Sequence, residues 1–220
     1  MSQAALLLSF DIAAEAQREH DDWHSHEHLP ERLAIPGFVR GSRWRGLGSG
    51  PAYFVMYEVQ ELGVLTSPAY MERLNHPSPW TAKMMPSYRG MRRGLCTLAA
   101  RAGHGLGGFG LLLRFGAAAA GGEALRAWLA DDLIPTLPAR SGLASATLWR
   151  SGVQAELTVE QRMRGQDAGV DGALLVTGFS ESAVDGAVQP SELARRGAID
   201  VASTTYQLVH CLDNRDLGDV

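Results

Sequence analysis

This chain contains the sequence LLLSFDIAAEAQREHDDWHSHEHLPERLAIPGFVRGSRWR at residues 6–45, and a related sequence, LLLRFGAAAAGGEALRAWLADDLIPTLPARSGLASATLWR, follows at residues 111–150. The two stretches align without a gap at an offset of 105, and 12 of the 40 aligned positions are identical. Self-similarity at a fixed offset indicates an internal duplication. We therefore expect the 220 residues to form two similar units, an N-terminal repeat over 1–102 and a degenerate C-terminal repeat over 107–216.

Each unit begins with an apolar run that is too short for a helix, which predicts a buried strand. In the second unit, Glu123–Leu133 places leucines three and four residues apart, as in a helix that packs one apolar stripe on a sheet. The predicted strands cover Ala4–Ile12, Phe38–Arg45, Tyr53–Val59 and Leu95–Ala100, then Phe109–Phe115, Leu143–Arg150, Ala173–Phe179 and Thr204–Cys211. Shorter helices are predicted at Pro68–Leu74 and Ser191–Arg196. The order βαββαβ, occurring twice, predicts an α+β fold of two ferredoxin-like repeats with antiparallel sheets.

Two stretches between these elements are predicted to be loops. The proline-rich segment Asn75–Gly90 separates a helix from a strand, and the glycine-rich segment Gly103–Gly110 joins the two units. The second segment has glycines in GxGxxG spacing. A dinucleotide-binding motif follows a strand and opens a helix, whereas this one precedes a strand. We therefore interpret it as a linker.

Composition excludes several classes of partner. The formal net charge of -4 arises from 24 acidic and 20 basic residues without a long block of one sign, so neither nucleic acid nor a membrane surface is an expected partner. No run approaches the roughly 18 to 20 apolar residues of a spanning helix. The two cysteines, Cys96 and Cys211, are too few for a disulfide scaffold, which favours a cytoplasmic location.

The first helix of the N-terminal unit is polar where its counterpart is apolar. Residues 15–28 read EAQREHDDWHSHEH, which is poor material for packing on a sheet. In the alignment of the two repeats, three histidines of the first stand opposite three leucines of the second: His20, His24 and His28 opposite Leu125, Leu129 and Leu133. At about 100° per residue these histidines share one helix face, so we expect the polar stripe to face the sheet.

Burying imidazoles in place of leucines costs about 1 to 3 kcal/mol for each unsatisfied polar group. We therefore expect some interaction of the imidazoles to offset this cost. A pocket between helix and sheet would use the histidines as acid, base or hydrogen-bond donor. A metal site would use His24 and His28, which are four residues apart, with a carboxylate from Glu27 or Glu31. A third interpretation leaves the histidine face exposed at an edge or buried in a subunit interface. We favour the pocket, and predict neither metal nor cofactor.

Pro30 is expected to break the helix at His28–Leu29, because its ring clashes with the preceding turn. His28 then lies at a helix end and is the first candidate for a functional residue. Tyr53 and Tyr57 share one face of a predicted strand, so a phenol can line the same cavity. The segment His76–Trp80, HPSPW, has the composition of an ordered lid or a subunit contact.

The segments WHSHEHLPER at 23–32, IPGF at 35–38 and RW at 43–44 resemble the EthD-like branch of the dimeric α+β barrel superfamily. The pattern of that branch is an aromatic residue, Glu-His-x-Pro, Pro-Gly-Phe and an arginine-aromatic strand. Residues 27–30, EHLP, match it position by position, whereas residues 132–135 of the second unit read DLIP. The resemblance therefore implies one site per chain, with His28 as its polar pocket residue.

The resemblance further implies a barrel made by two ferredoxin-like sheets, usually across a dimer and here within one chain. The superfamily includes cofactor-free polyketide cyclases, lactone isomerases, small monooxygenases and haem enzymes. We predict an enzyme that isomerises or cyclises an apolar carbonyl compound, such as a lactone or polyketide-like metabolite, by proton transfer. The predicted catalytic residues are His28, His24 and Tyr57, and the predicted substrate-binding residues are His20, Trp23, Tyr53 and Trp80.

The alternatives are a non-catalytic small-molecule binding protein and a cofactor-free or haem monooxygenase, with His24 or His28 as the iron ligand. The expected partner is a small-molecule ligand, and a homodimer is also compatible with the sequence.

Overall fold

The structure is a computed structural model that describes residues 3–117, 122–152, 158–165 and 167–218. Residues 1 and 2 of the predicted first repeat lie outside these ranges. The strands are β1 (Ala4–Ile12), β2 (Phe38–Gly46), β3 (Tyr53–Val59), β4 (Tyr88–Gly103), β5 (Phe109–Ala117), β6 (Leu143–Ser151), β7 (Ala168–Gly169), β8 (Gly172–Gly178) and β9 (Ala198–Asp213). The α-helices are α1 (Gln17–Trp23), α2 (Leu29–Leu33), α3 (Pro68–Asn75), α4 (Pro79–Met84), α5 (Gly122–Ala127), α6 (Val159–Arg164), α7 (Glu181–Asp185) and α8 (Pro190–Arg195). Segments of π-helix cover His24–His28 and Trp128–Leu133, and 3-10 turns cover Ala14–Ala16, Leu62–Thr66, Met85–Ser87, Ile134–Ala139 and Asn214–Leu217.

The strands form one sheet in the order β1-β3-β2-β9-β5-β8-β6-β4, and β4 pairs again with β1 to close a barrel. All pairs around the barrel are antiparallel, and β7 adds a short parallel pairing to β4. The first half contributes β4-β1-β3-β2 and the second half β9-β5-β8-β6, so the halves meet at β2–β9 and β4–β6. The predicted fold class, an α+β barrel with an antiparallel sheet, is confirmed.

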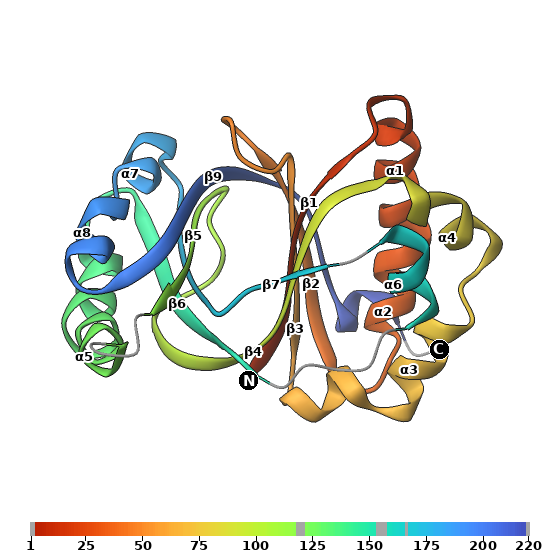
Figure 1. Cartoon of the computed structure of the whole chain (residues 1–220), viewed down its shortest axis with the longest axis horizontal. Coiled ribbons are helices and arrows are strands. Elements are labelled where there is room, and N and C mark those ends of the chain that lie inside the picture. Colours follow the sequence, from red (N-terminus) through yellow and green to blue (C-terminus); the bar gives the residue numbers. More distant parts are fainter. Residues whose placement is uncertain (1–2, 118–121, 153–157, 166, 219–220) are drawn as a thin grey trace.

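The helices cover the outside of the barrel on two opposite sides, one group over the sheet of each half (Figure 1). Strand residues alternate between the lumen and the helix-covered faces, so the described residues form three apolar clusters. In β3, for example, Phe54 and Met56 fill the lumen, whereas Tyr53, Val55 and Tyr57 pack under the helices of the first half. Residues two positions apart on a strand therefore lie on the same side of the barrel wall.

Several elements are longer or more numerous than the sequence patterns predict. The last strand of each half spans 16 residues, because its first part pairs within its own half and its last part pairs with the opposite half. The predicted loop Asn75–Gly90 contains α4, which Ser78 caps by accepting a hydrogen bond from the Thr81 amide. The connection between β6 and β8 contains α6 and β7, and it crosses to the first half, where α6 lies beside the helices of that half (Figure 1).

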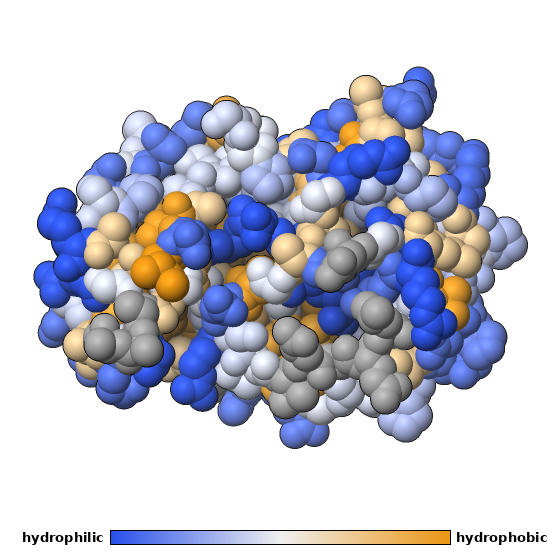
Figure 2. Space-filling view, in the orientation of Figure 1, coloured by the Kyte–Doolittle hydropathy of each residue, from blue (hydrophilic) through white to orange (hydrophobic). Residues whose placement is uncertain are grey.

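No helix among the described residues is long and apolar enough to cross a membrane. On the face shown in Figure 2, hydrophilic residues are widespread and apolar residues appear in small groups. The segment between Gly103 and Gly108 connects β4 to β5, as the linker interpretation predicts, and passes over one end of the barrel. Gly107 has to be glycine there, because a Cβ at this position would lie 1.9 Å from the Gly178 carbonyl oxygen.

Candidate active site

The first helix of the N-terminal half continues through Pro30 without the predicted break. Both His28 (φ -67°, ψ -44°) and Leu29 (φ -66°, ψ -48°) are helical, and the Leu29 amide donates to the His24 carbonyl, five residues back. This wide π-helical turn, His24–His28, accommodates a proline that has no N–H to donate. The second half has a π-helical segment at the corresponding position, Trp128–Leu133, before Pro135. The wide turn therefore belongs to both halves, while the histidines belong to one.

The three histidines of the stripe face the sheet, as predicted. His20, His24 and His28 are 0%, 1% and 7% exposed, which excludes a stripe exposed at an edge of the molecule. Their rings follow one another along the helix, with centroids 5.6 Å apart from His20 to His24 and again from His24 to His28. The stripe is thus a continuous buried row of imidazoles, referred to below as the histidine row.

Two tyrosines from the sheet compensate part of the cost of burying the histidine row. The hydroxyl of Tyr88 lies 3.2 Å from His20 Nε2, and the hydroxyl of Tyr57 lies 3.2 Å from His24 Nε2. The Nδ1 atoms of His24 and His28 are buried and have no hydrogen-bond partner within the described residues. Buried polar atoms without a partner are costly, so these two nitrogens mark the row as a candidate for chemistry.

Burial keeps the histidine row neutral. It lowers the pKa of His24 and of His28 well below the ordinary value of 6.5, and the positive charge of Arg32 lowers both further. Burial also raises the pKa of Tyr57 well above its ordinary value, so its hydroxyl stays protonated. At neutral pH the site therefore offers neutral imidazoles, which accept protons, and a phenol, which donates a hydrogen bond.

A small cavity of about 20 Å³ lies at the His28 end of the row. His28, Arg32, Tyr57 and Tyr70 line it from the first half, and Glu160, Gln161 and Arg164 of α6, with its N-cap Thr158, line it from the second half. This volume holds about one water molecule. Binding of an organic ligand at His28 therefore requires α6 to move away from the histidine row.

A buried ion pair fastens α6 over this cavity. Arg32 Nη2 lies 2.5 Å from Glu160 Oε1, and both side chains are almost completely buried. The other terminal nitrogen, Arg32 Nη1, is buried without a partner in the described part of the chain. Arg93 and Arg164 also line the cavity, and Arg164 is paired with the Asp167 carboxylate, so three guanidinium groups stand against two carboxylates. The excess of positive charge suits an anionic group.

The remaining predicted site residues lie at different distances from this cavity. Trp23 packs on the His28 ring with centroids 4.3 Å apart. Tyr53 lies beside His20, at the opposite end of the row, with its ring centroid 4.8 Å from that of His20. Trp80 lies on α4 and donates to Glu19 on the outer helix surface. The structure thus brings His24, Tyr57 and Trp23 to His28, and places Tyr53 and Trp80 elsewhere.

The glutamate of the EHLP segment has a structural task. Glu27 Oε1 accepts hydrogen bonds from Trp23 Nε1 at 3.2 Å and from the Ser78 hydroxyl at 2.5 Å. Ser78 is the N-cap of α4, so Glu27 ties that helix to the histidine row. This contact holds Trp23 against His28 and explains why a glutamate precedes the histidine.

Arg32, Glu160, Arg93 and Arg164 were missed by sequence reasoning. A signal existed for one of them, because Arg32 aligns with Leu137 in the duplication just as His28 aligns with Leu133. Glu160 and Arg164 gave no such signal, since the connection that carries them has no counterpart in the first half.

No group of three or more His, Cys, Asp or Glu side chains within the described ranges is placed to hold a metal ion. The haem alternative does not fit the geometry either. A cavity of about 20 Å³ is far smaller than a porphyrin, and Trp23 covers the ring of His28, one of the two predicted iron ligands. The residues of the row therefore do not fit a haem in this arrangement.

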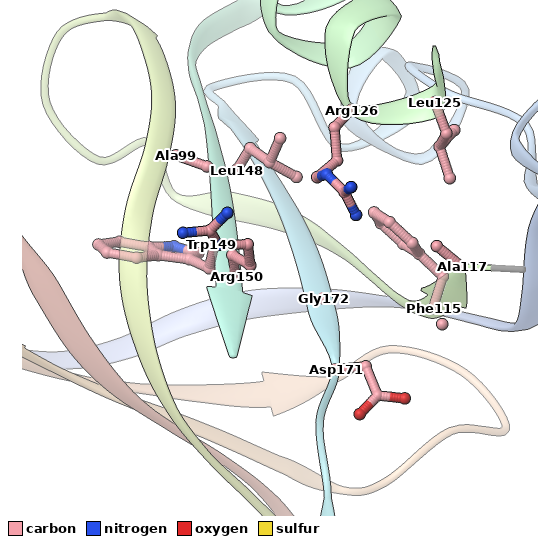
Figure 3. A pocket seen from close by; sticks show the side chains of 11 residues that line it. Ala99, Phe115, Ala117, Leu125, Arg126, Leu148, Trp149, Arg150, Asp171 and Gly172 are labelled. Atoms are coloured by element: carbon pink, nitrogen blue, oxygen red, sulfur yellow. The ribbon is translucent and has the colours of Figure 1, made fainter. Parts of the chain in front are cut away.

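The second half has a cavity of its own, of about 250 Å³, between α5 and the sheet. Figure 3 shows its apolar side chains, among them Phe115, Leu125 and Leu148, and its charged residues Arg126, Arg150 and Asp171. Leu125 and Leu148 align with His20 and Arg43 of the first half. The expectation of one site per chain thus applies to the histidines, whereas a cavity is present in each half.

Comparison with known proteins supports the fold. No family pattern and no curated protein matches the sequence. Among solved structures, an anthrone oxidase-like protein superimposes with a TM-score of 0.70 at 14% identity, covering 97% of this chain and 93% of that one. A protein of Lactobacillus acidophilus NCFM, provisionally described as a monooxygenase, gives 0.60 at 9% identity with 97% of both chains covered. A chlorite dismutase variant of Candidatus Nitrospira defluvii gives 0.54 at 9% identity, covering 97% and 92%. These likenesses show a dimeric α+β barrel fold.

The bond between His24 and Tyr57 can be measured by a double-mutant cycle. His24→Leu and Tyr57→Phe each leave a buried polar group without its partner, so each is expected to lower the free energy of unfolding by about 1 to 3 kcal/mol. The double variant removes both groups and is expected to lose less than the sum. Denaturant unfolding of the four proteins gives the coupling. Tyr57→Phe combined with Thr177→Val, a position facing the barrel lumen, is the control and should be additive; additivity of the first pair would contradict the bond.

Proposed function

We propose that the chain is an enzyme that removes a proton from a small, largely apolar carbonyl compound, with His28 as the base. The observation that carries this proposal is the pair of buried atoms without partners at one cavity, His28 Nδ1 and Arg32 Nη1. A neutral imidazole takes a proton from a carbon next to a carbonyl, and a guanidinium stabilises the oxyanion that forms. Both groups are present there, and both are already desolvated.

The other residues of the row have supporting roles in this proposal. Tyr57 lines the cavity and donates a hydrogen bond to the substrate oxygen, while His24 holds its hydroxyl in place. Trp23 fixes the plane of the His28 ring. His20 and Tyr53 extend the polar row away from the cavity, and Trp80 buttresses the helix from outside. The geometry therefore supports a substrate-binding role for His20, Tyr53 and Trp80 less than it supports one for Trp23.

The enolate formed by His28 has two fates. In the first it reacts with dioxygen, and a CH₂ group plus O₂ becomes a carbonyl group plus water. The names of the structural neighbours, an anthrone oxidase-like protein and proteins provisionally described as monooxygenases, support this fate. In the second the enolate is protonated elsewhere or attacks within the molecule, which gives the isomerisation or cyclisation predicted from the sequence. We favour the reaction with dioxygen.

Replacement of His28 tests the proposal directly. The purified chain is incubated with anthrone and with a butenolide lactone, while an oxygen electrode follows O₂ and NMR in D₂O follows exchange of the acidic C–H. His28→Asn is expected to lower the rate about 10²- to 10⁴-fold, the usual contribution of a general base. His26→Asn, which alters an exposed histidine of the same helix, is the matched control. Unchanged rates in His28→Asn would remove His28 as the base, and exchange without O₂ uptake would favour isomerisation.

The remaining sequence predictions fit this proposal. Membership of the EthD-like branch is supported by residues 27–30, and an internal duplication with repeats at 1–102 and 107–216 is supported by the matching element order of the halves. A cytoplasmic location, a mechanism without a cofactor and a small-molecule ligand are parts of the same proposal. A homodimer is not needed to complete the barrel, because one chain closes it.

A further inference from the structure

The barrel lumen changes character from one end to the other. Along β3 its inward residues run from Phe54 through Met56 to Glu58, and along β8 they run from Ala173 through Leu175 to Thr177. The apolar ends of these strands pack together in the lumen, whereas a cavity of about 770 Å³ occupies the polar end. That volume lies within the range of small-molecule sites, about 300 to 1,000 Å³. It is separate from the histidine row, which lies outside the barrel wall.

Charge in this lumen cavity is arranged around one buried glutamate. Glu58 is 2% exposed and accepts hydrogen bonds from Arg40 Nε at 2.6 Å and from Arg101 Nη2 at 3.2 Å. Each guanidinium has five N–H donors, so the two arginines carry more donors than one carboxylate accepts. The side chains of Arg40 and Arg101 are about one-third exposed, so donors that Glu58 does not engage are open to solvent and to a ligand. The cluster therefore suits a further anion.

A planar group borders the same charges. The indole of Trp149 is 1% exposed, lines the cavity, and has a buried Nε1 with no hydrogen-bond partner in the described segments. Arg101 lies over this indole, with its guanidinium carbon 5.8 Å from the ring centroid. Met56 and Leu175 supply apolar wall next to it. A ligand held here contacts an aromatic face, an N–H donor and guanidinium donors together.

We propose that the polar end of the barrel lumen is a second binding site, and that it takes a planar aromatic monocarboxylate. The carboxylate pairs with Arg101 and Arg40, the aromatic body packs along Trp149 and the apolar wall, and a polar substituent accepts from Trp149 Nε1. The linker between the two halves borders the opening. Ser145 donates to the Gly105 carbonyl at 2.9 Å, so the glycine-rich segment is fastened to the same lumen wall.

Titration with 2-naphthoate, followed by isothermal calorimetry, tests this second site. One equivalent is expected to bind, and the neutral 2-naphthamide is expected to bind at least about tenfold more weakly, because it lacks the charge that pairs with guanidinium. Arg101→Gln is expected to weaken 2-naphthoate by a similar factor. Trp149→Phe keeps the aromatic face and loses the N–H. It should therefore weaken 1-hydroxy-2-naphthoate, whose hydroxyl accepts from this N–H, more than it weakens 2-naphthoate.

Controls separate this site from the histidine row. Arg126→Gln removes an exposed arginine of the second half and should leave 2-naphthoate binding unchanged, as should His28→Asn. Circular dichroism shows whether each variant is folded. No binding of 2-naphthoate, or binding that survives Arg101→Gln, overturns the lumen site. Binding that disappears in His28→Asn assigns the carboxylate to the histidine row and also overturns it. None of these results depends on catalysis, so the proposed function is tested separately.

Discussion

Acidification from about pH 7 to about pH 5 is expected to destabilise the folded chain, by up to about 1.4 kcal/mol per pH unit for each histidine that stays neutral in the fold. Burial lowers the pKa of His20, and lowers those of His24 and His28 well below 6.5, whereas in the unfolded chain they titrate near that value. Below the unfolded pKa the unfolded state therefore binds more protons than the folded state. The contribution to stability is fully present above that pKa and is lost as the pH falls toward the folded values.

Urea unfolding between pH 5 and pH 8 measures this dependence. The variant His24→Leu/His28→Leu, which restores the residues found at the corresponding positions of the second half, is expected to lose most of the slope. His26→Leu changes an exposed histidine on the same helix and should keep it. An unchanged slope in the double leucine variant would show that His24 and His28 do not contribute to the acid response, which contradicts their burial as neutral imidazoles.

The fold could be predicted from sequence largely because of the duplication. Strands at Ala4–Ile12 and Tyr53–Val59 match the structure at both ends, because an apolar run with polar or proline boundaries is a local signal. The 16-residue strands β4 and β9 were predicted as shorter segments. The missed residues at the start of each strand, 88–94 and 198–203, pair with β1 and β5 of their own half, and those at the end, 101–103 and 212–213, pair with the opposite half. Pairing across the halves is a property of the assembled barrel and leaves no local pattern.

The candidate site could be predicted in part, since three of its residues stand out only by comparison of the halves. The same comparison contains two further substitutions, Arg32 for Leu137 and Arg43 for Leu148, and both arginines are buried against the histidine helix. The contact of Arg32 with Glu160 could not be predicted, because the two residues are 128 positions apart and belong to different halves. The predicted helix break at Pro30 was wrong because the π-helical turn His24–His28 accommodates the proline.

Removal of the carboxylate charge at Glu160 is expected to have the largest effect of any single substitution considered. Glu160→Gln leaves the Arg32 guanidinium buried without its partner, and such a change costs about 3 to 5 kcal/mol. Because the pair joins α6 to α2 of the other half, the loss should also expose the amides of α6 and of the histidine row to faster hydrogen exchange. Thermal unfolding and hydrogen exchange measure the two effects.

A matched double variant decides whether the unpaired Arg32 charge causes the loss of stability in Glu160→Gln. Arg32→Leu/Glu160→Leu replaces both charges by apolar side chains, and the second half already has leucine at the position corresponding to Arg32. Replacing a whole buried pair in this way is often neutral or stabilising, by about 1 to 4 kcal/mol, so the double variant should be at least as stable as the wild type. Glu123→Gln breaks an exposed pair with Arg126 and should cause no measurable change. If Glu160→Gln behaves like Glu123→Gln, α6 is not docked on the histidine row in solution, and the row opens to ligands without the movement that the closed cavity requires.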